Sequence, residues 1–443
     1  MKASEIFEAD VLDLAHDGRG VARIDGKTVF VDGALPGERV RLRIFKRRRQ
    51  YDEAGLVEVI HASADRVEPK CAHFGICGGC ALQHLAPAAQ LGAKERQLLD
   101  NLTRIGGVQP DRLIPALRGP PWGYRRRARL GIKYVQKKGR VLVGFRERAA
   151  PYVADVRRCE VLIDRFATLP EQLASLVETL SLREKIPQVE VAAADDAGLH
   201  DPWQAALVFR LMGDPTAEDL TKLEAFADRH SVQIFLQSGG LDTVRPLREN
   251  YPPLQYTVVE QMITIQFGPV DFFQINREIN ASMLQAAVDA LRPAAGDTVL
   301  DLFCGLGNFT LSMARHAGRV VGVDADLGLI AKARANAMRN HALNTEFHAG
   351  NLFHPDLAAQ WAQRPYDLIL LDPPRAGAAE ILPRVAHWRP RRLVYISCHP
   401  GSLARDARTL IDGLGFRLTA AGVMDMFPHT THVESIAVFE RAA

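Results

Sequence analysis

Two consecutive stretches decide the fold: residues 299–314, VLDLFCGLGNFTLSMA, and residues 320–326, VVGVDAD. Each begins as a short run of buried-strand composition, and the first continues through Gly305 and Gly307 into a predicted helix. Such glycines let the backbone approach a ligand, and the amides at the start of the helix point towards it. Asp324, at the end of the second strand, is placed to accept hydrogen bonds from ribose hydroxyls. The two stretches predict the nucleotide-binding unit of an α/β fold.

A departure from a common pattern bears on the kind of nucleotide. Thr310 stands where the dinucleotide motif GxGxxG has its third glycine, which favours S-adenosylmethionine (SAM) over a dinucleotide; a purely structural turn is the other alternative. From about Gln274 onward, predicted strands alternate with predicted helices, which indicates a parallel, doubly wound sheet. The further elements predicted there are a helix, residues 330–340, and three strands, residues 368–371, 393–396 and 435–439.

Two of these strands end in groups that can take part in chemistry. Asp372 opens the loop DPPR after one strand, and Cys398 follows the next, at the edge where open α/β sheets bind ligands. The prolines stiffen the loop and hold its carbonyls outward, which suits recognition of a planar amide or nucleobase, although a simple turn has the same composition. Cys398 is a candidate covalent nucleophile, with a buried structural cysteine as the alternative. Cys304 is predicted to be structural.

A carboxylate near the end of the sequence completes the candidate chemistry. Glu434 immediately precedes the last apolar strand, so its carboxylate is expected to be partly buried. Burial raises the pKa of a carboxyl group, which suits it to the abstraction of a proton. A salt-bridged glutamate is the alternative interpretation.

The other cysteines include a tight group in the sequence CAHFGICGGCALQH, residues 71–84. Cys71, Cys77 and Cys80 lie on this Gly-rich loop, and Cys159 is the only other cysteine before the final domain. Four thiolates can hold either zinc or an iron–sulfur cluster. Zinc sites more often use two CxxC pairs and only one is present here, so the spacing favours a cluster over zinc and over no metal.

The first 62 residues alternate apolar and polar side chains between Asp-Gly and Pro-Gly turns, which predicts a small closed β-barrel. Such barrels often bind oligonucleotides, but the pattern also fits a β domain without this role. The net charge is only +3, yet residues 39–49 hold seven basic residues and no acid, and residues 122–148 hold ten against one. Aromatic residues interleave with both runs, which favours a polyanionic partner over two solvated faces.

The composition is ordinary for a globular protein: of 443 residues, 47% are hydrophobic and 24% are charged. No run approaches the length of a membrane span, and the first ten residues lack the apolar centre of a signal peptide. We therefore expect a cytoplasmic protein without a membrane partner, in which the six cysteines are ligands or catalysts rather than disulfides.

Taken together, these motifs resemble a known family, the bacterial RNA 5-methyluridine methyltransferases, and within it the 23S rRNA enzymes. GALPGERV resembles the TRAM RNA-binding barrel, CxxFGxCGGCxxQH the family's iron–sulfur loop, and DFFQIN, DLFCGLGNFTL, DPPRAG, SCHP and HVES its catalytic domain. The motifs occur in order over nearly the whole chain. Two departures are visible: His399 follows the candidate nucleophile where the family usually has Asn, and Asp324 stands where Glu is common.

The resemblance implies a multi-domain α/β architecture with two cofactors, SAM and a [4Fe-4S] cluster. The implied domains are a TRAM/OB-like β-barrel over residues 1–62, an α+β central domain with the iron–sulfur loop over 63–90 and 117–262, and a Rossmann-like SAM-dependent methyltransferase domain over 91–116 and 263–443. The implied cluster ligands are Cys71, Cys77, Cys80 and Cys159. The residues implied to line the SAM site are Gln274, Phe303, Asn308, Asp324, Asn351 and Asp372.

For the reaction, the resemblance implies a monomer that methylates carbon 5 of a specific uridine in 23S rRNA, free or partly assembled, with Cys398 as nucleophile and Glu434 as base. The alternative is a related enzyme with a different or dual rRNA and tRNA target. An amino-group methyltransferase would need no Cys398, and a non-catalytic RNA-binding factor would need neither group. Because the cluster is remote from Cys398 in sequence, we expect it to be structural or an RNA contact rather than redox-active.

Overall fold

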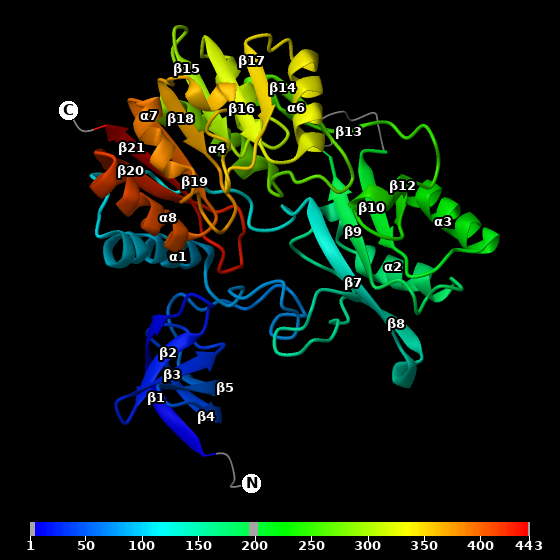
Figure 1. Cartoon of the computed structure of the whole chain (residues 1–443). Coiled ribbons are helices and arrows are strands. Elements are labelled where there is room, and N and C mark those ends of the chain that lie inside the picture. Colours follow the sequence, from blue (N-terminus) through cyan, green and yellow to red (C-terminus); the bar gives the residue numbers. More distant parts are fainter. Residues whose placement is uncertain (1–4, 195–202, 442–443) are drawn as a thin grey trace.

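The computed structural model describes residues 5–194 and 203–441 and builds that part of the chain around three large sheets and a short hairpin. The first sheet is a closed barrel at one end of the molecule, coloured blue in Figure 1. Alternate residues of its strands, such as Val29 and Val31, point into the barrel core. In pairing order the strands are β1 (Ile6–Leu14), β2 (Gly20–Ile24), β3 (Lys27–Asp32), β5 (Tyr51–His61) and β4 (Arg39–Arg47).

The second sheet belongs to the middle of the chain. Helices α2 (Leu169–Glu178) and α3 (Ala217–His230) pack against it through apolar residues such as Leu173 and Leu223. The hairpin formed by its last two strands extends away from the rest of the sheet (Figure 1). In pairing order the strands are β12 (Val244–Pro246), β11 (Gln233–Gln237), β10 (Ala205–Arg210), β9 (Gln188–Ala193), β7 (Arg127–Val135) and β8 (Arg140–Gly144).

The third sheet has five neighbouring parallel strands, followed by β21, which runs antiparallel to both of its neighbours. This arrangement brings the carboxyl ends of the parallel strands to one edge. In pairing order its strands are β17 (Thr345–Ala349), β16 (Arg319–Asp324), β15 (Thr298–Leu302), β18 (Leu368–Leu371), β19 (Arg392–Ser397), β21 (Glu434–Arg441), β20 (Phe416–Met424) and β6 (Arg112–Leu113).

Helices cover both faces of the third sheet, so its central strands are apolar throughout. Along β18, Leu368 and Leu370 join the core on one face, and Ile369 and Leu371 join the core on the other. The first face is covered by α4 (Arg277–Leu291), α5 (Asn308–Ala314), α6 (Leu327–Arg339) and the hairpin of β13 (Leu254–Val258) and β14 (Ile263–Phe267). The second is covered by α1 (Pro87–Asn101), α7 (Val385–Trp388) and α8 (Pro400–Arg408).

The predicted barrel and the predicted doubly wound sheet are both present. The predicted boundary between the central domain and the methyltransferase domain, at residues 262 and 263, falls in the turn of the β13–β14 hairpin. Both strands of this hairpin pack into the core of the third sheet. In the part of the chain that the structure describes, no helix is both long and apolar enough to cross a membrane.

Candidate active site

The candidate nucleophile and base lie opposite each other at one edge of the third sheet. Cys398 follows β19, and Glu434 is the first residue of β21, which runs antiparallel to β19. The register pairs Ser397 with Ser435, and the Ser435 hydroxyl donates to the Ser397 carbonyl at 3.2 Å. One residue further along this register, Cys398 is opposite Glu434. The antiparallel insertion of β21 beside β19 therefore creates the pair.

Cys398, Glu434 and Asp372 form what we call the catalytic cluster, in which each group resists ionisation. Burial raises the pKa of Cys398 to about 11, and the charges of Glu434 and Asp372 act in the same direction, whereas the Arg375 guanidinium lowers this pKa. Burial raises the pKa of Asp372 to about 7. Burial, with a contribution from Asp372, also holds the pKa of Glu434 well above its ordinary value. A positive charge entering the cluster would favour the ionised form of all three groups.

The turn that carries Cys398 is closed by side chains on both sides. The Ser397 hydroxyl accepts a hydrogen bond from the His399 amide at 3.1 Å. His399 is the N-cap of α8, and its Nδ1 accepts from the Ser402 amide at 3.1 Å. The residue that departs from the family pattern thus caps the helix as asparagine would, because both side chains offer an acceptor. Burial and the charges of Arg375 and Arg405 lower the pKa of His399, which keeps this acceptor available.

The Gly-rich loop after β15 is attached to the end of β16. The Phe303 amide donates to the Val323 carbonyl at 2.9 Å, and the Asp324 carboxylate accepts from the Gly305 amide at 3.0 Å. Phe303 has a φ of +67° and Gly307 one of +90°, so the loop turns sharply before α5 begins. The acid predicted to bind ribose therefore also fixes the loop that would approach the ligand.

The other predicted SAM residues differ in how freely they can meet a ligand. The Asn308 side chain donates to Asn280 at 2.9 Å and accepts from the Tyr256 hydroxyl at 3.0 Å, so much of its hydrogen-bonding capacity is used within the protein. Asn351 is exposed and accepts from the Phe353 amide at 3.0 Å, which orders the turn after β17.

Asp372 lies beside the Gly-rich loop, and Gln274 lies on the segment before α4. The Gln274 carbonyl accepts from the Arg126 guanidinium at 3.0 Å, and the Gln274 residue is 9% exposed. The register pairs Leu302 of β15 with Leu371 of β18, so Asp372 lies beside the start of the loop. Within the described chain the Asp372 carboxylate forms no ion pair, which suits it to a positively charged ligand.

Asp301 is a buried acid that the sequence-based predictions do not include. It is fully buried on β15, and the Thr310 hydroxyl donates to its Oδ2 at 2.5 Å. Burial raises its pKa to about 8, so the carboxyl keeps its proton at neutral pH. The sequence feature that could have indicated Asp301 is an acid inside the apolar run VLDLF, because a buried acid has to be neutral or paired.

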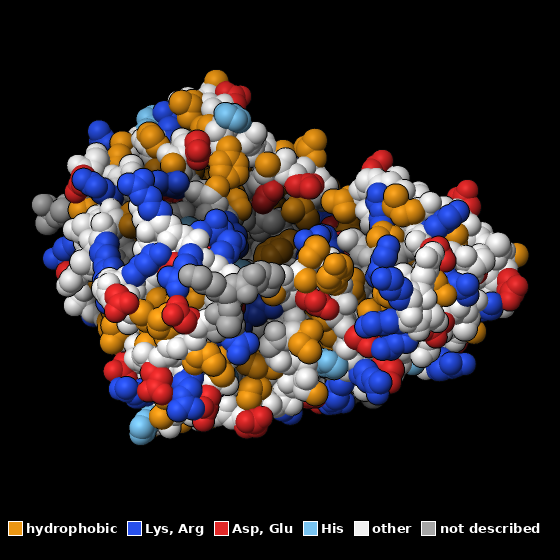
Figure 2. Space-filling model, turned by 90° about the horizontal axis from the view of Figure 1, so that it is seen from below, with side chains coloured by type: hydrophobic (Ala, Val, Ile, Leu, Met, Phe, Trp, Pro, Cys, Tyr) orange, Lys and Arg blue, Asp and Glu red, His pale blue; other side chains and the backbone are white. Residues whose placement is uncertain are grey.

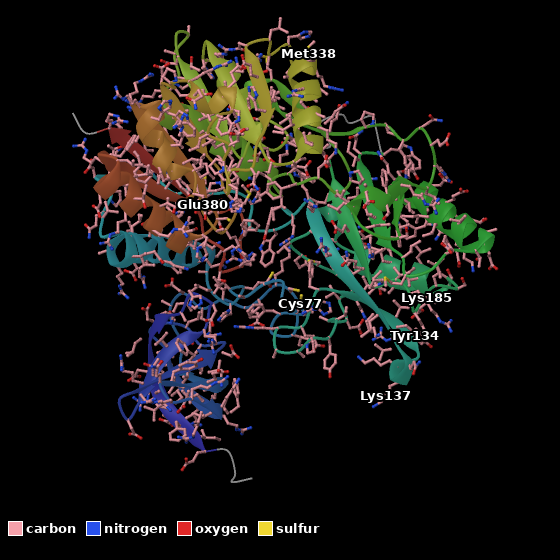
Figure 3. All side chains as sticks on the ribbon, in the orientation of Figure 1. Cys77, Tyr134, Lys137, Lys185, Met338 and Glu380 are labelled. Atoms are coloured by element: carbon pink, nitrogen blue, oxygen red, sulfur yellow. The ribbon has the colours of Figure 1, made fainter. Side chains whose placement is uncertain are left out.

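The four predicted cluster ligands line a single cavity of about 300 Å³, which we call the cysteine cavity. It lies beside the loop around Cys77, labelled in Figure 3, where sulfur atoms gather. Burial raises the pKa of Cys77 to about 11 and that of Cys80 to about 12, and the neighbouring thiols add to both shifts. Cys71 and Cys159 complete the lining thiols.

The donor set of the cysteine cavity fits a [4Fe-4S] cluster. Four thiols face one space, and the Gly79 amide points at the Cys77 sulfur at 3.4 Å, as amides do around cluster sulfurs. A Cβ atom on Gly78 would lie 2.9 Å from the Arg146 carbonyl, so the close approach of the loop requires glycine there. Among the described residues, no group of three His, Cys, Asp or Glu side chains is arranged to hold a single metal ion.

One wall of the cysteine cavity comes from the segment that leads to Glu434, the candidate base. Phe427, Thr430, Thr431 and His432 all line the cavity. Glu434 is only two residues beyond His432. The four cysteines are remote from Cys398 and Glu434 in sequence, but in the fold one segment both lines the cavity and leads to Glu434.

Both predicted basic runs reach the surface, although not as uniform patches. On β4, Arg41 pairs with acids of the neighbouring strands, and in the second run Arg126 is buried. Lys137 and Lys138 are exposed at the turn between β7 and β8, where Figure 3 shows Lys137 at the tip of the projecting hairpin. Seen from below, Lys and Arg side chains are spread around a central hollow with hydrophobic side chains in its floor (Figure 2).

Comparison with known proteins identifies the family. The tRNA (uracil-5-)-methyltransferase family matches residues 89–349 and 359–442, and the TRAM domain matches residues 3–57. The chain belongs to this methyltransferase family. The 23S rRNA (uracil(1939)-C(5))-methyltransferase RlmD of Methylococcus capsulatus is 48% identical over 439 residues, 99% of this chain and 98% of its own. The RlmD of Alkalilimnicola ehrlichii is 48% identical over 440 residues, 99% of this chain and 97% of its own.

A solved structure shows the same architecture. The tRNA (uracil-54, C5)-methyltransferase of Pyrococcus abyssi, in complex with S-adenosyl-L-homocysteine, matches with a TM-score of 0.73 at 22% identity, over 98% of this chain and 100% of that one. The predicted TRAM barrel, the α/β methyltransferase fold and the resemblance to RNA 5-methyluridine methyltransferases are confirmed. The protein is a SAM-dependent methyltransferase of this family.

Proposed function

We propose that this protein transfers a methyl group from SAM to carbon 5 of one uridine in 23S rRNA, with Cys398 as nucleophile and Glu434 as base. The observation that carries the proposal is the Ser397–Ser435 pair, because one residue beyond it the thiol of Cys398 meets the buried carboxyl group of Glu434. Methylation of an amino group needs neither, and a non-catalytic RNA-binding factor has no use for the pair. Full-length similarity to relatives named as 23S rRNA enzymes supports the RNA target.

The chemistry requires both groups because carbon 5 of uracil is too weak a nucleophile to take a methyl group directly. The Cys398 thiolate adds to carbon 6, and the electron pair of the 5,6 double bond moves towards the carbonyl at carbon 4 to give an enolate. Carbon 5 then takes the methyl group that SAM would supply as an electrophile, and the broken sulfur–methyl bond would leave S-adenosylhomocysteine. Glu434 removes the carbon 5 proton, the double bond re-forms and the thiolate leaves. Covalent catalysis of this kind divides one difficult step into easier ones.

The chain's own residues prepare these steps. Ser397 and His399 fix the turn that carries the thiol. The raised pKa of Glu434 makes its carboxylate a stronger base than an exposed one, once it is ionised. The residues proposed to hold SAM are Gln274, Phe303, Asn308, Asp324, Asn351 and Asp372.

We also propose that Cys71, Cys77, Cys80 and Cys159 hold a [4Fe-4S] cluster, because these four thiols line one cavity. Protein purified without oxygen should be brown and contain about four irons per chain. A colourless protein with one tightly bound zinc would contradict the cluster. The cluster's proposed role is structural or in RNA contact, since no step of the methyl transfer is an oxidation or a reduction.

The target is proposed to be the uridine equivalent to uracil 1939, the position for which the relatives are named. That base must leave its stack to reach Cys398, at a cost of a few kcal/mol. The TRAM barrel and the lysines at the β7–β8 turn would offset this cost by holding the surrounding RNA. We propose that the protein acts in the cytoplasm, as a monomer, on free or partly assembled 23S rRNA.

Mapping 5-methyluridine in rRNA and tRNA from cells that lack this protein tests the function directly. We expect one 23S rRNA position to lose its methyl group and every tRNA position to keep it. Loss at two rRNA positions, or in tRNA, would favour the alternative of a dual or different target. A 23S rRNA fragment with 5-fluorouracil at the target should trap the enzyme covalently, because fluorine cannot leave as a cation. An amino-group methyltransferase would form no such adduct.

A further inference from the structure

Glu434 follows a largely buried segment, residues 425–433, which connects β20 to β21. Asp425 is 8% exposed, His429 is 2% exposed and Val433 is 2% exposed. His429 has a φ of +64°, a left-handed conformation that a residue other than glycine adopts when its surroundings impose it. The contacts around segment 425–433 therefore determine its path.

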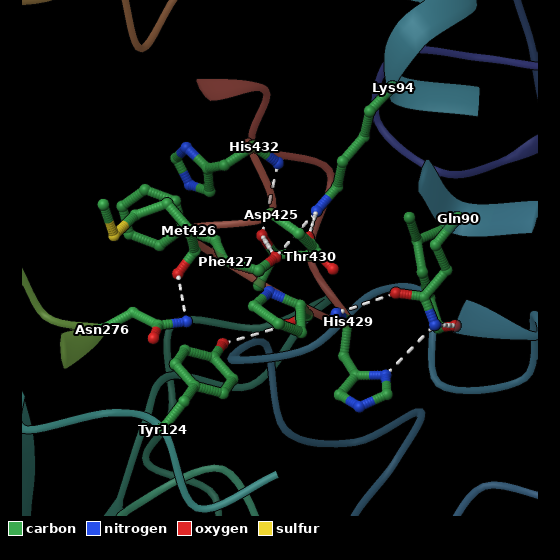
Figure 4. Close-up of polar contacts among 12 residues, drawn as sticks. Gln90, Lys94, Tyr124, Asn276, Asp425, Met426, Phe427, His429, Thr430 and His432 are labelled. Atoms are coloured by element: carbon green, nitrogen blue, oxygen red, sulfur yellow. Dashed lines mark hydrogen bonds and ion pairs between the residues drawn. The ribbon is translucent and has the colours of Figure 1, made fainter. Parts of the chain in front are cut away.

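Two polar side chains of α1 supply the central contacts, drawn in Figure 4. Gln90 and Lys94 are four residues apart and so share one face of the helix, and they are 1% and 2% exposed. Lys94 Nζ donates to the Asp425 carboxylate at 2.7 Å and to the Phe427 carbonyl at 2.9 Å. Gln90 Oε1 accepts from the His429 amide at 2.8 Å, and Gln90 Nε2 lies 3.1 Å from His429 Nδ1.

Further contacts secure the segment to the cysteine loop and to the central part of the chain. The amides of Ala81 and Leu82 donate to the His429 carbonyl at 2.8 and 3.0 Å. The Tyr124 hydroxyl donates to the Pro428 carbonyl at 2.9 Å. Segment 425–433 is thus held at several points immediately before Glu434.

A buried lysine is a costly way to obtain stability alone. Burial disfavours its charge and lowers the pKa of Lys94, although Asp425 opposes this shift. Breaking a buried ion pair is destabilising, but apolar packing of similar volume often stabilises a fold equally well. Buried polar contacts of this kind can instead specify one conformation. Here the conformation specified is that of the segment ending at the catalytic base.

We propose that Gln90 and Lys94 are positioning residues for Glu434, which fix segment 425–433 so that the carboxylate meets the proton on carbon 5. This inference rests on the proposed function, because it requires Glu434 to act as the base. A displacement of about 1 Å can cost on the order of a hundredfold in rate. Glu434 acts only after methyl transfer, so its displacement slows elimination and leaves the earlier steps intact.

The distinguishing readout is therefore the covalent intermediate rather than activity. We expect Lys94→Met and Gln90→Leu to accumulate a methylated protein–RNA adduct on denaturing gels, at least about tenfold above wild type, with SAM affinity unchanged. The double variant Lys94→Met/Asp425→Asn leaves no unpaired buried charge, and serves if Lys94→Met does not fold. Leu98→Ala is the matched control: Leu98 is fully buried on the same helix but does not contact the segment through a polar group.

Glu434→Gln separates failure of the inference from failure of the proposed function. If Glu434→Gln accumulates no adduct, the base is misassigned and the proposed mechanism is wrong. If Glu434→Gln accumulates adduct and neither α1 variant does, the positioning role is wrong. Equal accumulation in Leu98→Ala would also overturn it, because general packing of α1 would then explain the effect. Adduct in both α1 variants and in Glu434→Gln, but not in Leu98→Ala, is the result that supports it.

Discussion

Cys398 and the four thiols of the cysteine cavity differ in what surrounds them. In the catalytic cluster, Cys398 is opposite a carboxyl group, whereas in the cysteine cavity Cys77 and Cys80 share a space with other thiols. Burial raises the pKa of Cys398, of Cys77 and of Cys80. A thiol among acids keeps its proton until a substrate arrives, while several thiols around one space lose their protons together to a metal. The side chains around a thiol, rather than its burial, therefore distinguish a candidate nucleophile from a candidate set of ligands.

The largest expected effect separates Cys398 from Cys304, a buried cysteine in the Gly-rich loop after β15. Cys398→Ala should lower methyl transfer to a 23S rRNA fragment by at least about a thousandfold, because no other group can open the 5,6 double bond. SAM and RNA should still bind. Cys304→Ala is the control: Cys304 is 5% exposed, and its loss should cost about 1 kcal/mol of stability with little loss of activity. Near-normal activity in Cys398→Ala would contradict the covalent mechanism.

The next effect tests the cysteine cavity by itself. Cys80→Ser should reduce the iron content from about four to below one per chain, because three thiolates hold a cubane poorly. The melting temperature should fall by on the order of 10 °C as the cavity loses its occupant. The affinity for SAM should be unchanged, since the cavity and the Gly-rich loop share no residue. Retention of full iron content in Cys80→Ser would show that Cys80 is not a ligand, and Cys304→Ala should keep its iron.

A smaller effect is expected at the proposed SAM site. Asp324→Ala should weaken SAM binding by roughly 1.5–3 kcal/mol, the scale of hydrogen bonds to a charged group, and leave the iron content unchanged. Asp326→Ala is the matched control, because Asp326 caps α6 two residues away by accepting from the Gly328 amide at 2.7 Å. Calorimetric titration with SAM compares the two. Equal SAM affinity in Asp324→Ala and wild type would mean that the ribose is bound elsewhere.

Local sequence patterns were sufficient to place the reactive groups at the ends of strands. The strand predicted at 368–371 has those bounds in the structure, because a short apolar run between polar residues is buried on both faces. Cys398 and Glu434 could each be placed at the end of an apolar run. That they face each other could not be predicted from such patterns, because it depends on β21 pairing antiparallel with β19. Periodicity describes a strand but does not identify its neighbour.

Helix α1 shows a second limit. Residues 94–105 have the spacing of an amphipathic helix, but α1 begins at Pro87, where Ala86 offers no side-chain acceptor and so gives no capping signal. Gln90 and Lys94 are polar residues on the buried face, so they interrupt the apolar stripe by which a helix is recognised. The same two residues are proposed to position Glu434. The local pattern fails here because the helix carries polar contacts to a distant segment.

The smallest expected effect concerns the acid that the catalytic cluster leaves without an ion pair. Burial raises the pKa of Asp372 from 3.8 to about 7, so the folded protein binds this proton more tightly than the unfolded chain does. The stability from this proton is fully present below pH 3.8 and is lost as pH rises through about 7. Asp372→Asn should therefore stabilise the SAM-free protein by about 1–2 kcal/mol at pH 8 and by almost nothing at pH 4.

Asp219 of α3 gives the control of opposite sign. Burial would raise its pKa, but hydrogen bonds from Ser181 and Thr216 outweigh this and lower it to about 2, so Asp219→Asn should destabilise the protein at neutral pH. Denaturant unfolding at several pH values measures both variants. If Asp372→Asn destabilised the protein at pH 8, the carboxylate would have a partner in the folded state. If Asp372→Asn stabilised the protein but weakened SAM binding, the unpaired acid would lower the stability of the SAM-free protein and favour binding of the positively charged cofactor. The thiols of the cysteine cavity are not involved in this exchange.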